Sequence, residues 1–486
     1  MTFNSIEFLI FYPIILLLNY ITPLKFRWIP LLALSLYFYL YTSAELIFLI
    51  VFTILVSWVC SLIIEQSESK FVKKMCLTVT LLVCLGILAF FKYYNFLADS
   101  VAGISGMISG TKPDFSLDLI LPVGISFYTF QTLSYAIDVY RGDVKTERHL
   151  GYYALFVTFF PQLVAGPIER PGNLMPQLKA PHKINKYDSM KGAQKMLMGF
   201  FKKIVVADVI AVYVNHVYND PENATAIGII IATALFAVQI YCDFSGYTDI
   251  AIGAARIMGY KLMQNFDRPY TARSIAEFWR RWHISLSTWF KDYLYFPLGG
   301  SRCPKQWMNY RNLMIVFLVS GLWHGANWTF LIWGFLHGIY QVIGKLTRKK
   351  RDAFYDKIGI NREGKLYAWG QRITTFLLVD FAWIFFRANS VQDVGILLKK
   401  LFTTWNIAPT ATFAAMDITL VGTLIVLFAI LIMNQMDRAV NHYDVADGSA
   451  AISKRGTFIF LVWAVIFTWM ILLQGGGGST FIYFQF

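Results

Sequence analysis

The chain has 486 residues, of which 57% are hydrophobic and 15% charged, and its formal net charge is +14. Soluble domains carry about 25% charged and 45–50% apolar residues, so this composition excludes an ordinary globular domain and predicts a multi-span membrane protein. The basic residues stand between apolar runs and no basic domain is set apart. That pattern is typical of cytoplasmic loops, and nucleic acid is not an expected partner.

The first apolar run begins close to the N-terminus and has no basic residue before it. A signal peptide would carry a positive segment there, so we interpret this run as a permanent first span. Lys25 and Arg27 follow it directly. Because positive residues stay on the cytoplasmic side, we expect the N-terminus outside the cell and residues 25–27 inside.

Apolar windows without a charged residue recur along the chain. A helix needs about 20 residues to cross about 30 Å of hydrocarbon. The windows close to this length are 8–24, 28–44, 46–64, 75–91, 119–137, 224–242, 418–436 and 456–474. Two weaker candidates contain charged residues, namely 199–218 and 373–386.

The run 151–168 is expected to enter the membrane and return to the same side. It contains Pro161 and Pro167, and basic residues flank it on both sides, at 141–148 and 179–203. Two cytoplasmic flanks argue against a single crossing. Broken helices at membrane depth are tolerated where they are buried in protein or line a cavity.

Residues 274–294 are expected to form one amphipathic helix at the membrane interface. At about 100° per residue, the aromatic side chains gather on one face and most charged side chains on the other. His283 falls at the boundary, with Trp279 and Ser287 on the adjacent turns. The pattern leaves two interpretations open for His283, the rim of an anchoring helix or a functional group.

The longest uncharged run, 312–344, is too long for one span. Its 33 residues would form a helix of about 50 Å. Basic residues precede it and the cluster at 347–351 follows it. We therefore expect either a segment that dips in and returns or two closely spaced spans, with His324 near the turn in both cases.

His324 is an imidazole at membrane depth, where polar groups are costly and mark functional sites by default. Gly321 and Gly325 flank it and would let a substrate or another backbone approach, while Asn327 and Trp328 could orient the ring or wall a site. The pattern alone leaves open a structural histidine that joins two helices. For His337, 13 residues further on, we favour the structural interpretation.

Other polar residues offer weaker signals. Asp243 and Asp249 are six residues apart and not on one helical face, so a two-carboxylate site is not expected, and Asp380 is expected to pair with a neighbour. The five cysteines contain no C-x-x-C pair. No metal site is expected, and no ATPase, serine-hydrolase or zincin motif is present.

Four blocks, at 121–142, 159–170, 265–301 and 321–338, resemble the membrane-bound O-acyltransferase (MBOAT) family, and within it the bacterial branch that O-acetylates polysaccharides such as alginate. The resemblance covers essentially the whole chain, so one integral-membrane domain over 1–486 is expected. It implies an all-α polytopic fold of about eleven transmembrane helices, with re-entrant and interfacial helices around a central tunnel.

The resemblance also implies residue roles. The family's two signature polar positions match His283 and His324, and the second is the catalytic histidine. His324 would act as general base on an acceptor hydroxyl that attacks a thioester, and His283 would orient a substrate or support the oxyanion. The candidate substrate-binding residues are Trp279, Arg280, Arg281, Ser287, Lys291, Trp323, Asn327 and Trp328. The cations among them would suit either the phosphates of a donor or lipid headgroups.

The implied donor is acetyl-CoA or an acyl-carrier thioester from the cytoplasm, with no bound cofactor. The implied partners are membrane lipids and an extracellular polysaccharide, or a secreted or membrane-anchored acetyltransferase protein, at the cytoplasmic membrane of a bacterium. One alternative is D-alanyl transfer from a carrier protein to teichoic acid. A different class is an acyl or lipid transporter, or an export-complex scaffold without catalysis, which would leave His324 without a task.

Overall fold

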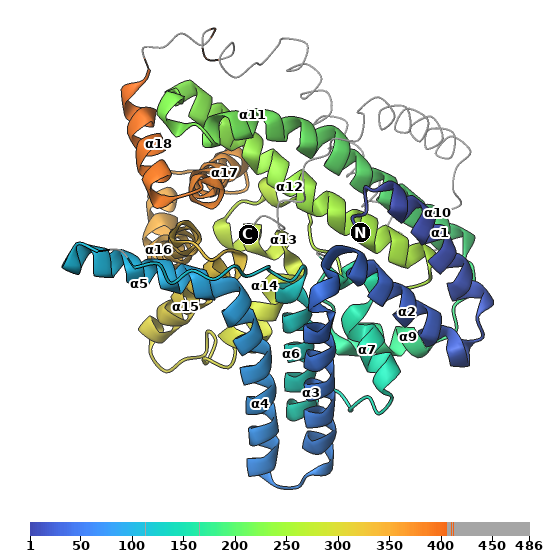
Figure 1. Cartoon of the computed structure of the whole chain (residues 1–486). Coiled ribbons are helices and arrows are strands. Elements are labelled where there is room, and N and C mark those ends of the chain that lie inside the picture. The colour runs from blue at the N-terminus through green and yellow to red at the C-terminus, as the bar shows by residue number, and fades with distance from the viewer. Residues whose placement is uncertain (112, 165, 406–409, 411, 413–486) are drawn as a thin grey trace. The chain divides into compact units, whose positions relative to one another are not determined.

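The computed structural model describes residues 1–111, 113–164, 166–405, 410 and 412. Regular structure in this part of the chain is helical and includes no strand, so the expected all-α fold is confirmed (Figure 1). The predicted spans 418–436 and 456–474, and the tail after them, lie outside the described residues.

Two compact units make up the chain, and each is built from separate pieces of sequence. The first comprises Met1–Leu197 and Tyr247–Met263, and the second comprises Met198–Gly246 and Gln264–Phe486. Two helices, α10 (Lys186–Phe200) and α12 (Ala226–Ile257), contribute to both. Because continuous helices run through two of the divisions, no flexible linker marks them, and the sequence by itself predicts a single domain.

Five of the predicted apolar windows, 8–24, 28–44, 46–64, 75–91 and 119–137, overlap helices of the first unit. Besides α10 these helices are α1 (Ile6–Ile21), α2 (Leu24–Ser43), α3 (Ile47–Gln66), α4 (Lys70–Leu88), α5 (Tyr94–Ser109), α6 (Ile125–Arg141), α7 (Leu150–Thr158), α8 (Phe160–Leu163) and α9 (Pro171–Lys179). The predicted span 119–137 is helical only from Ile125, because Pro122 and a left-handed Gly124 (φ 72°) precede the helix.

Three helical stretches of the described chain are long and apolar enough to cross a membrane, namely Ala44–Gln66, Lys70–Ser109 and Ala226–Ile257. The second has 40 residues and would extend about 60 Å if straight, about twice the hydrocarbon thickness. A π-helical turn at Ala89–Tyr93 interrupts it, and α5 leaves α4 there at a steep angle (Figure 1).

The predicted break in the run 151–168 is present. Helix α7 ends at Thr158, Phe159 has an extended ψ of 114°, and the short α8 restarts with Pro161 in its first turn. Proline fits a first helical turn because its missing N–H would have no partner there. The Ser35 hydroxyl accepts a hydrogen bond from the backbone N–H of Phe160 at 3.2 Å. The first N–H of the buried helix α8 therefore has a partner.

In the first unit, the C-terminal part of α12 is held by polar contacts from α1 and by glycines. Tyr12 donates to the carbonyl of Ala254 at 3.0 Å, and Asn19 donates to the carbonyl of Met258 at 3.0 Å. A Cβ added at Gly253 would lie 2.5 Å from the carbonyl oxygen of Gly192 on α10. Glycine is required for this close approach of two backbones.

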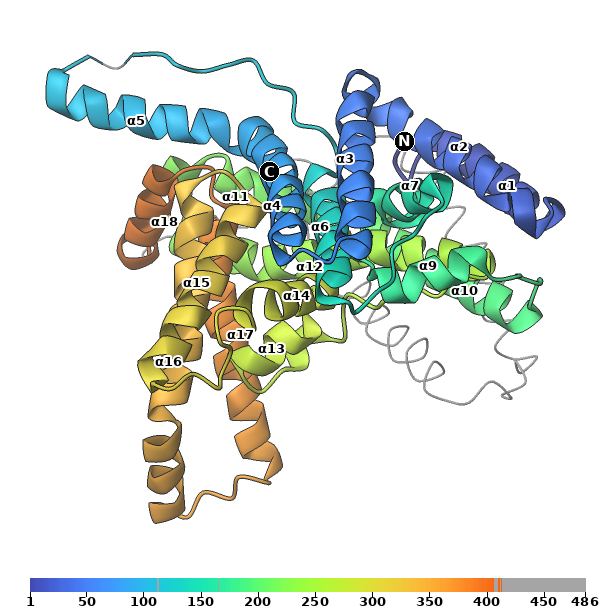
Figure 2. The same cartoon turned by 90° about the horizontal axis from the view of Figure 1, so that it is seen from below.

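The second unit carries both histidines of interest. Its helices after α10 are α11 (Asp208–Tyr218), the N-terminal part of α12, α13 (Ile275–Arg281), α14 (Ile284–Phe290), α15 (Gln306–His324), α16 (Trp328–Lys357), α17 (Lys365–Arg387) and α18 (Val391–Thr403). Helices α15 and α16 pack on each other, and α16 packs on α17, with α16 and α17 running together to the bottom of Figure 2.

Candidate active site

The segment around His283 is not one continuous helix, so the prediction for 274–294 is wrong. Helix α13 ends at Arg281 and α14 begins at Ile284, with His283 between them in the left-handed region (φ 43°, ψ 56°). Few non-glycine residues adopt this conformation, which costs on the order of 1–3 kcal/mol and is concentrated at functional sites. The break removes His283 from the boundary between the two faces of one helix, where the sequence pattern places it.

Asn265 supplies the hydrogen bonds that the broken helix lacks. Its side-chain Oδ1 accepts from the backbone N–H of Ser285 at 3.1 Å and from the Ser285 hydroxyl at 2.6 Å. Its backbone carbonyl accepts from the N–H of Ile284 at 2.9 Å. Asn265 and Ser285 are both buried, so a distant residue satisfies the first turn of α14 and fixes the backbone at His283.

His283 is fully buried against other rings. Its imidazole meets Phe244 of α12 at 4.6 Å between centroids, Trp323 at 5.8 Å and His324 at 6.5 Å. Burial lowers the pKa of His283 to about 3, because the low-dielectric surroundings disfavour the imidazolium. At physiological pH this imidazole is therefore neutral, with one N–H donor and one acceptor nitrogen.

His324 is the last residue of α15, at the turn of a helical hairpin. The chain folds back through three residues and α16 begins at Trp328, so the predicted turn near His324 is present as two packed helices. The His324 side chain is only 2% exposed and contacts the rings of Trp323 and Trp333 at 5.0 Å and of Phe386 at 5.3 Å. The hairpin and α17 thus build an aromatic wall around the imidazole.

Glycines let the two arms of the hairpin touch. A Cβ at Gly321 would lie 2.3 Å from the carbonyl oxygen of Phe330, and one at Gly334 would lie 2.3 Å from that of Phe317. At Gly325, a Cβ would overlap the ring of Phe330. The sequence left open whether Gly321 and Gly325 allow a substrate or another part of the chain to approach. These contacts show the approach of another part of the chain.

His337 accepts a hydrogen bond from Trp279. The indole Nε1 of Trp279 donates to Nδ1 of His337 at 3.2 Å, and both side chains are buried. Because Nδ1 accepts, the proton of a neutral His337 lies on Nε2. His324 and His337 belong to different helices and both contact the ring of Trp333, at 5.0 Å and 4.9 Å. His337 therefore belongs to the same aromatic cluster as His324, although the two lie on different helices.

The predicted substrate-binding cations lie on or near the surface. Arg280 and Lys291 are exposed, whereas Arg281 pairs with Glu277 at 2.7 Å. Ser287 donates to the carbonyl of Trp282 at 3.1 Å. Of these residues, Arg280 and Lys291 present charge outward, where it could meet a soluble donor or a lipid headgroup.

The predicted aromatic and amide residues occupy different positions. Trp323 is buried beside both histidines, and Trp279 is buried against α15 and α16. Asn327 caps α16 by accepting from Thr329 N–H at 3.0 Å, and it donates to the carbonyl of Asn389. Trp328 is 53% exposed. Only Trp323 and Trp279 of this group therefore belong to the buried aromatic cluster around the histidines.

A buried charge network in the second unit is not evident from the sequence. Lys203 lies 2.8 Å from Asp208 and 2.7 Å from Asp243, and all three side chains are less than 10% exposed. In the first unit Asp249 faces Lys195 at 3.6 Å. The two aspartates of α12 are thus paired separately, in line with their spacing. For Asp380, the side-chain Oδ1 has no hydrogen-bond partner in the described part of the chain.

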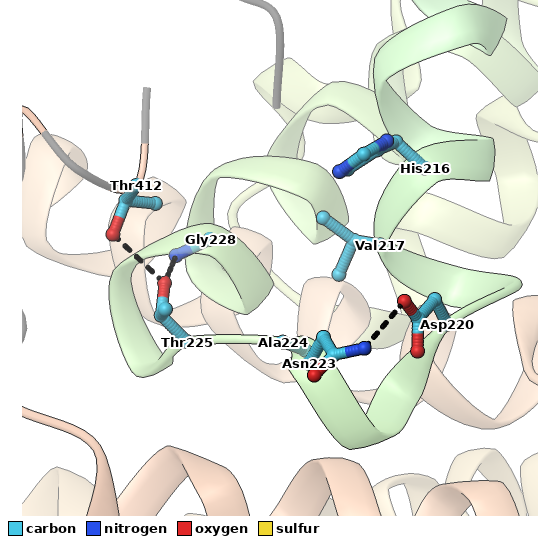
Figure 3. Close-up of a pocket in the computed structure, with 8 residues that line it drawn as sticks. All are labelled: His216, Val217, Asp220, Asn223, Ala224, Thr225, Gly228 and Thr412. Carbon is cyan, nitrogen blue, oxygen red and sulfur yellow. Dashed lines mark hydrogen bonds between the residues drawn. The ribbon is translucent and has the colours of Figure 1, made fainter. Parts of the chain in front are cut away.

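A small pocket lies elsewhere in the second unit and contains none of the predicted site residues. Figure 3 shows its lining from α11, the start of α12 and Thr412. The Thr225 hydroxyl lies 2.9 Å from that of Thr412 and accepts the N–H of Gly228 at 3.0 Å. These bonds cap the start of α12, which is a structural role.

The membrane-bound O-acyltransferase family profile matches residues 144–385, a range that includes His283 and His324. The chain is 37% identical to the probable alginate O-acetylase of Pseudomonas aeruginosa, over 89% of this chain and 81% of that protein. It is 35% identical to the probable alginate O-acetylase of Pseudomonas putida, over the full length of both proteins. It is 36% identical to the peptidoglycan O-acetyltransferase of Helicobacter pylori, over 76% of this chain and 72% of the relative.

Proposed function

The chain belongs to the membrane-bound O-acyltransferase family, and from this premise we propose that it moves an acetyl group from a cytoplasmic thioester to the hydroxyls of an extracellular polysaccharide, with His324 as general base. The observation that carries the proposal is the meeting of His283 and His324, 6.5 Å apart, inside a buried aromatic wall. The O-acetyltransferase names of relatives at 35–37% identity support acetyl transfer to a polysaccharide.

The reaction needs one base at a water-poor site. A neutral His324 takes the proton of the acceptor hydroxyl as its oxygen forms a bond to the thioester carbonyl carbon. The tetrahedral intermediate then collapses, the C–S bond breaks, and the thiolate recovers the proton from the imidazolium. Burial excludes water, which would otherwise hydrolyse the thioester.

His283 acts in this scheme as a neutral hydrogen-bonding group. Its depressed pKa keeps it uncharged, so it can donate one hydrogen bond and accept another. Its left-handed backbone is held by Asn265. A group fixed in this way orients the donor or the acceptor without moving during the reaction.

The donor enters from the cytoplasm as acetyl-CoA or an acyl-carrier thioester. Support comes from the exposed Arg280 and Lys291, whose positive charges suit phosphate groups. In the same proposal the N-terminus lies outside the cell, and about eleven spans surround a central tunnel through which the acetyl group passes. The final acceptor is the polysaccharide itself or a secreted or membrane-anchored partner protein that passes the group on.

The test uses the full-length protein in proteoliposomes with acetyl-CoA, and alginate or peptidoglycan as acceptor. Release of the CoA thiol and acetyl transfer to the polymer are both measured. We expect His324→Ala to abolish transfer, while the matched variant His216→Ala, an exposed histidine on α11, keeps the normal rate. Undiminished acetyl transfer by His324→Ala would overturn the proposed base. Activity only with a D-alanyl carrier thioester would overturn the acetyl assignment.

A further inference from the structure

We propose that Trp333 is a further catalytic residue, whose indole N–H donates a hydrogen bond to the carbonyl oxygen of the thioester as that oxygen becomes an oxyanion. This inference rests on the proposed function, because it takes acetyl transfer beside His324 as its starting point. It names the group that stabilises the negative charge, whereas the proposed function names the base.

Trp333 lies in the wall of the same site. It occupies the second turn of α16, with no exposed surface, and its ring meets that of His324 at 5.0 Å and an interplanar angle of 85°. It also contacts Phe386, which in turn contacts His324. The imidazole of His324 and the indole of Trp333 therefore belong to the same buried wall, in direct contact with each other.

The N–H of Trp333 is buried without an acceptor among the residues that the structure describes. The neighbouring Trp279, whose ring is 5.6 Å away, donates its N–H to His337. Buried polar groups are normally hydrogen-bonded, and an N–H without an acceptor destabilises the fold. Trp279 thus has an acceptor for its N–H, whereas the N–H groups of Trp333 and Trp383 have none within hydrogen-bonding distance in the described chain. Of these last two, Trp333 is the one whose ring contacts His324, which points to a ligand beside the base as its acceptor.

The chemistry of the indole limits what that ligand atom can be. Tryptophan has a donor and no acceptor, so it cannot take the proton of the attacking hydroxyl. When the acceptor oxygen bonds to the carbonyl carbon, the C=O π electrons move to the oxygen and the proton moves to His324. The Trp333 N–H donates to that oxyanion and keeps its own hydrogen. When the C–S bond breaks, the C=O bond re-forms and the thiolate takes the proton from His324.

Trp383 provides a matched control. It is equally buried, and its ring stacks on Trp333 at 6.0 Å and 19°. Its other ring neighbours in the described chain are Phe236, Trp282 and Phe386, and His324 is not among them. Changes at Trp383 therefore disturb the packing of the same cluster without removing a donor beside the base.

The experiment replaces the indole N–H with sulfur by incorporating benzothienylalanine at position 333, which preserves the size of the ring. We expect kcat for acetyl transfer to fall about 100-fold or more while KM for acetyl-CoA changes by less than about 3-fold, because the lost bond exists only in the transition state. The same replacement at position 383 should leave both constants close to normal. An unchanged kcat, or a rise in KM alone, overturns the proposal.

A second pair of variants covers the case in which the analogue disturbs folding. Trp333→Phe lacks a donor and Trp333→His restores one in a smaller ring. We expect Trp333→His to recover part of the kcat that Trp333→Phe loses, and equal rates in the two overturn the proposal. If His324→Ala is inactive but the analogue at position 333 is fully active, Trp333 is not the oxyanion donor, and His324 remains the base. Activity in His324→Ala removes the base assignment itself.

Discussion

The imidazole rings of His283 and His324 lie 6.5 Å apart, although one belongs to a break between two seven-residue helices and the other to the end of a 19-residue helix. Each ring also contacts Trp323. Two separate segments of the chain therefore hold the two candidate catalytic groups, and both imidazoles contact the same buried tryptophan. The position of each histidine therefore depends on its local backbone as well as on its side chain.

Substitutions at His283 should separate chemistry from backbone conformation. Asparagine tolerates the left-handed region, whereas a β-branched residue does not. We expect His283→Asn to fold and to lose most activity, and His283→Val to be less stable than His283→Asn by about 1–3 kcal/mol. Thermal unfolding in detergent measures the difference. Equal stability of the two variants would show that the left-handed backbone is not strained.

Asn265 should be needed for both stability and activity. Asn265→Ala leaves the buried N–H and hydroxyl of Ser285 without their acceptor, at a cost of about 1–3 kcal/mol for an unsatisfied donor. We expect a lower unfolding temperature and a reduced kcat. Ser285→Ala removes only the hydroxyl bond and should cost less. If Ser285→Ala is the more damaging change, Asn265 does not support the break as argued.

Residue chemistry and charge placement predict much of this site from the sequence. The 33 uncharged residues between basic flanks predict a chain reversal near His324, because no single helix of that length fits a bilayer. The reversal is present, with α15 ending at His324. The pairing of His283 with His324 as the two signature positions comes only from the family resemblance, and their proximity is a finding of the structure, since periodicity along one segment carries no information on contacts between segments.

The break at His283 could not be predicted from local pattern. Residues 274–294 have the periodicity of one amphipathic helix, and nothing in them marks the interruption. The hydrogen bonds that stabilise it come from Asn265, 18 residues before His283 in the chain. The network of Lys203 with Asp208 and Asp243 was missed for the same reason, because its members come from different helices. Tertiary contacts decide both features.

Gly321 should be intolerant of alanine. The added Cβ would lie 2.3 Å from the carbonyl oxygen of Phe330, so α15 and α16 must separate. We expect a loss of about 1–3 kcal/mol in the free energy of unfolding, and lower activity because His324 is on the displaced arm. Gly344→Ala is the matched control, since nothing lies within 4 Å of a Cβ there. It should be neutral or stabilise α16 by up to about 1 kcal/mol.

Glu169 should make the stability of the first unit depend on pH. Its side chain is buried and accepts hydrogen bonds from the N–H of Met263 and from Asn173 at 2.7 Å. Burial raises its pKa from 4.5 to about 7, despite the opposing effect of these bonds. The folded state therefore binds a proton more tightly than the unfolded state. The contribution of protonated Glu169 to the free energy of unfolding is fully present below pH 4.5 and is lost as the pH rises through 7.

Glu169→Gln keeps an oxygen acceptor for Met263 and removes the titration. Between pH 5 and 8, a shift of this size corresponds to a loss on the order of 3 kcal/mol in the normal protein. We expect the unfolding temperature of Glu169→Gln to vary less over this range and to exceed that of the normal protein at pH 8. Differential scanning fluorimetry of both proteins in detergent at several pH values measures the two curves. Parallel curves would show that Glu169 does not change its protonation on folding, because any titration common to both proteins cancels in the difference between them.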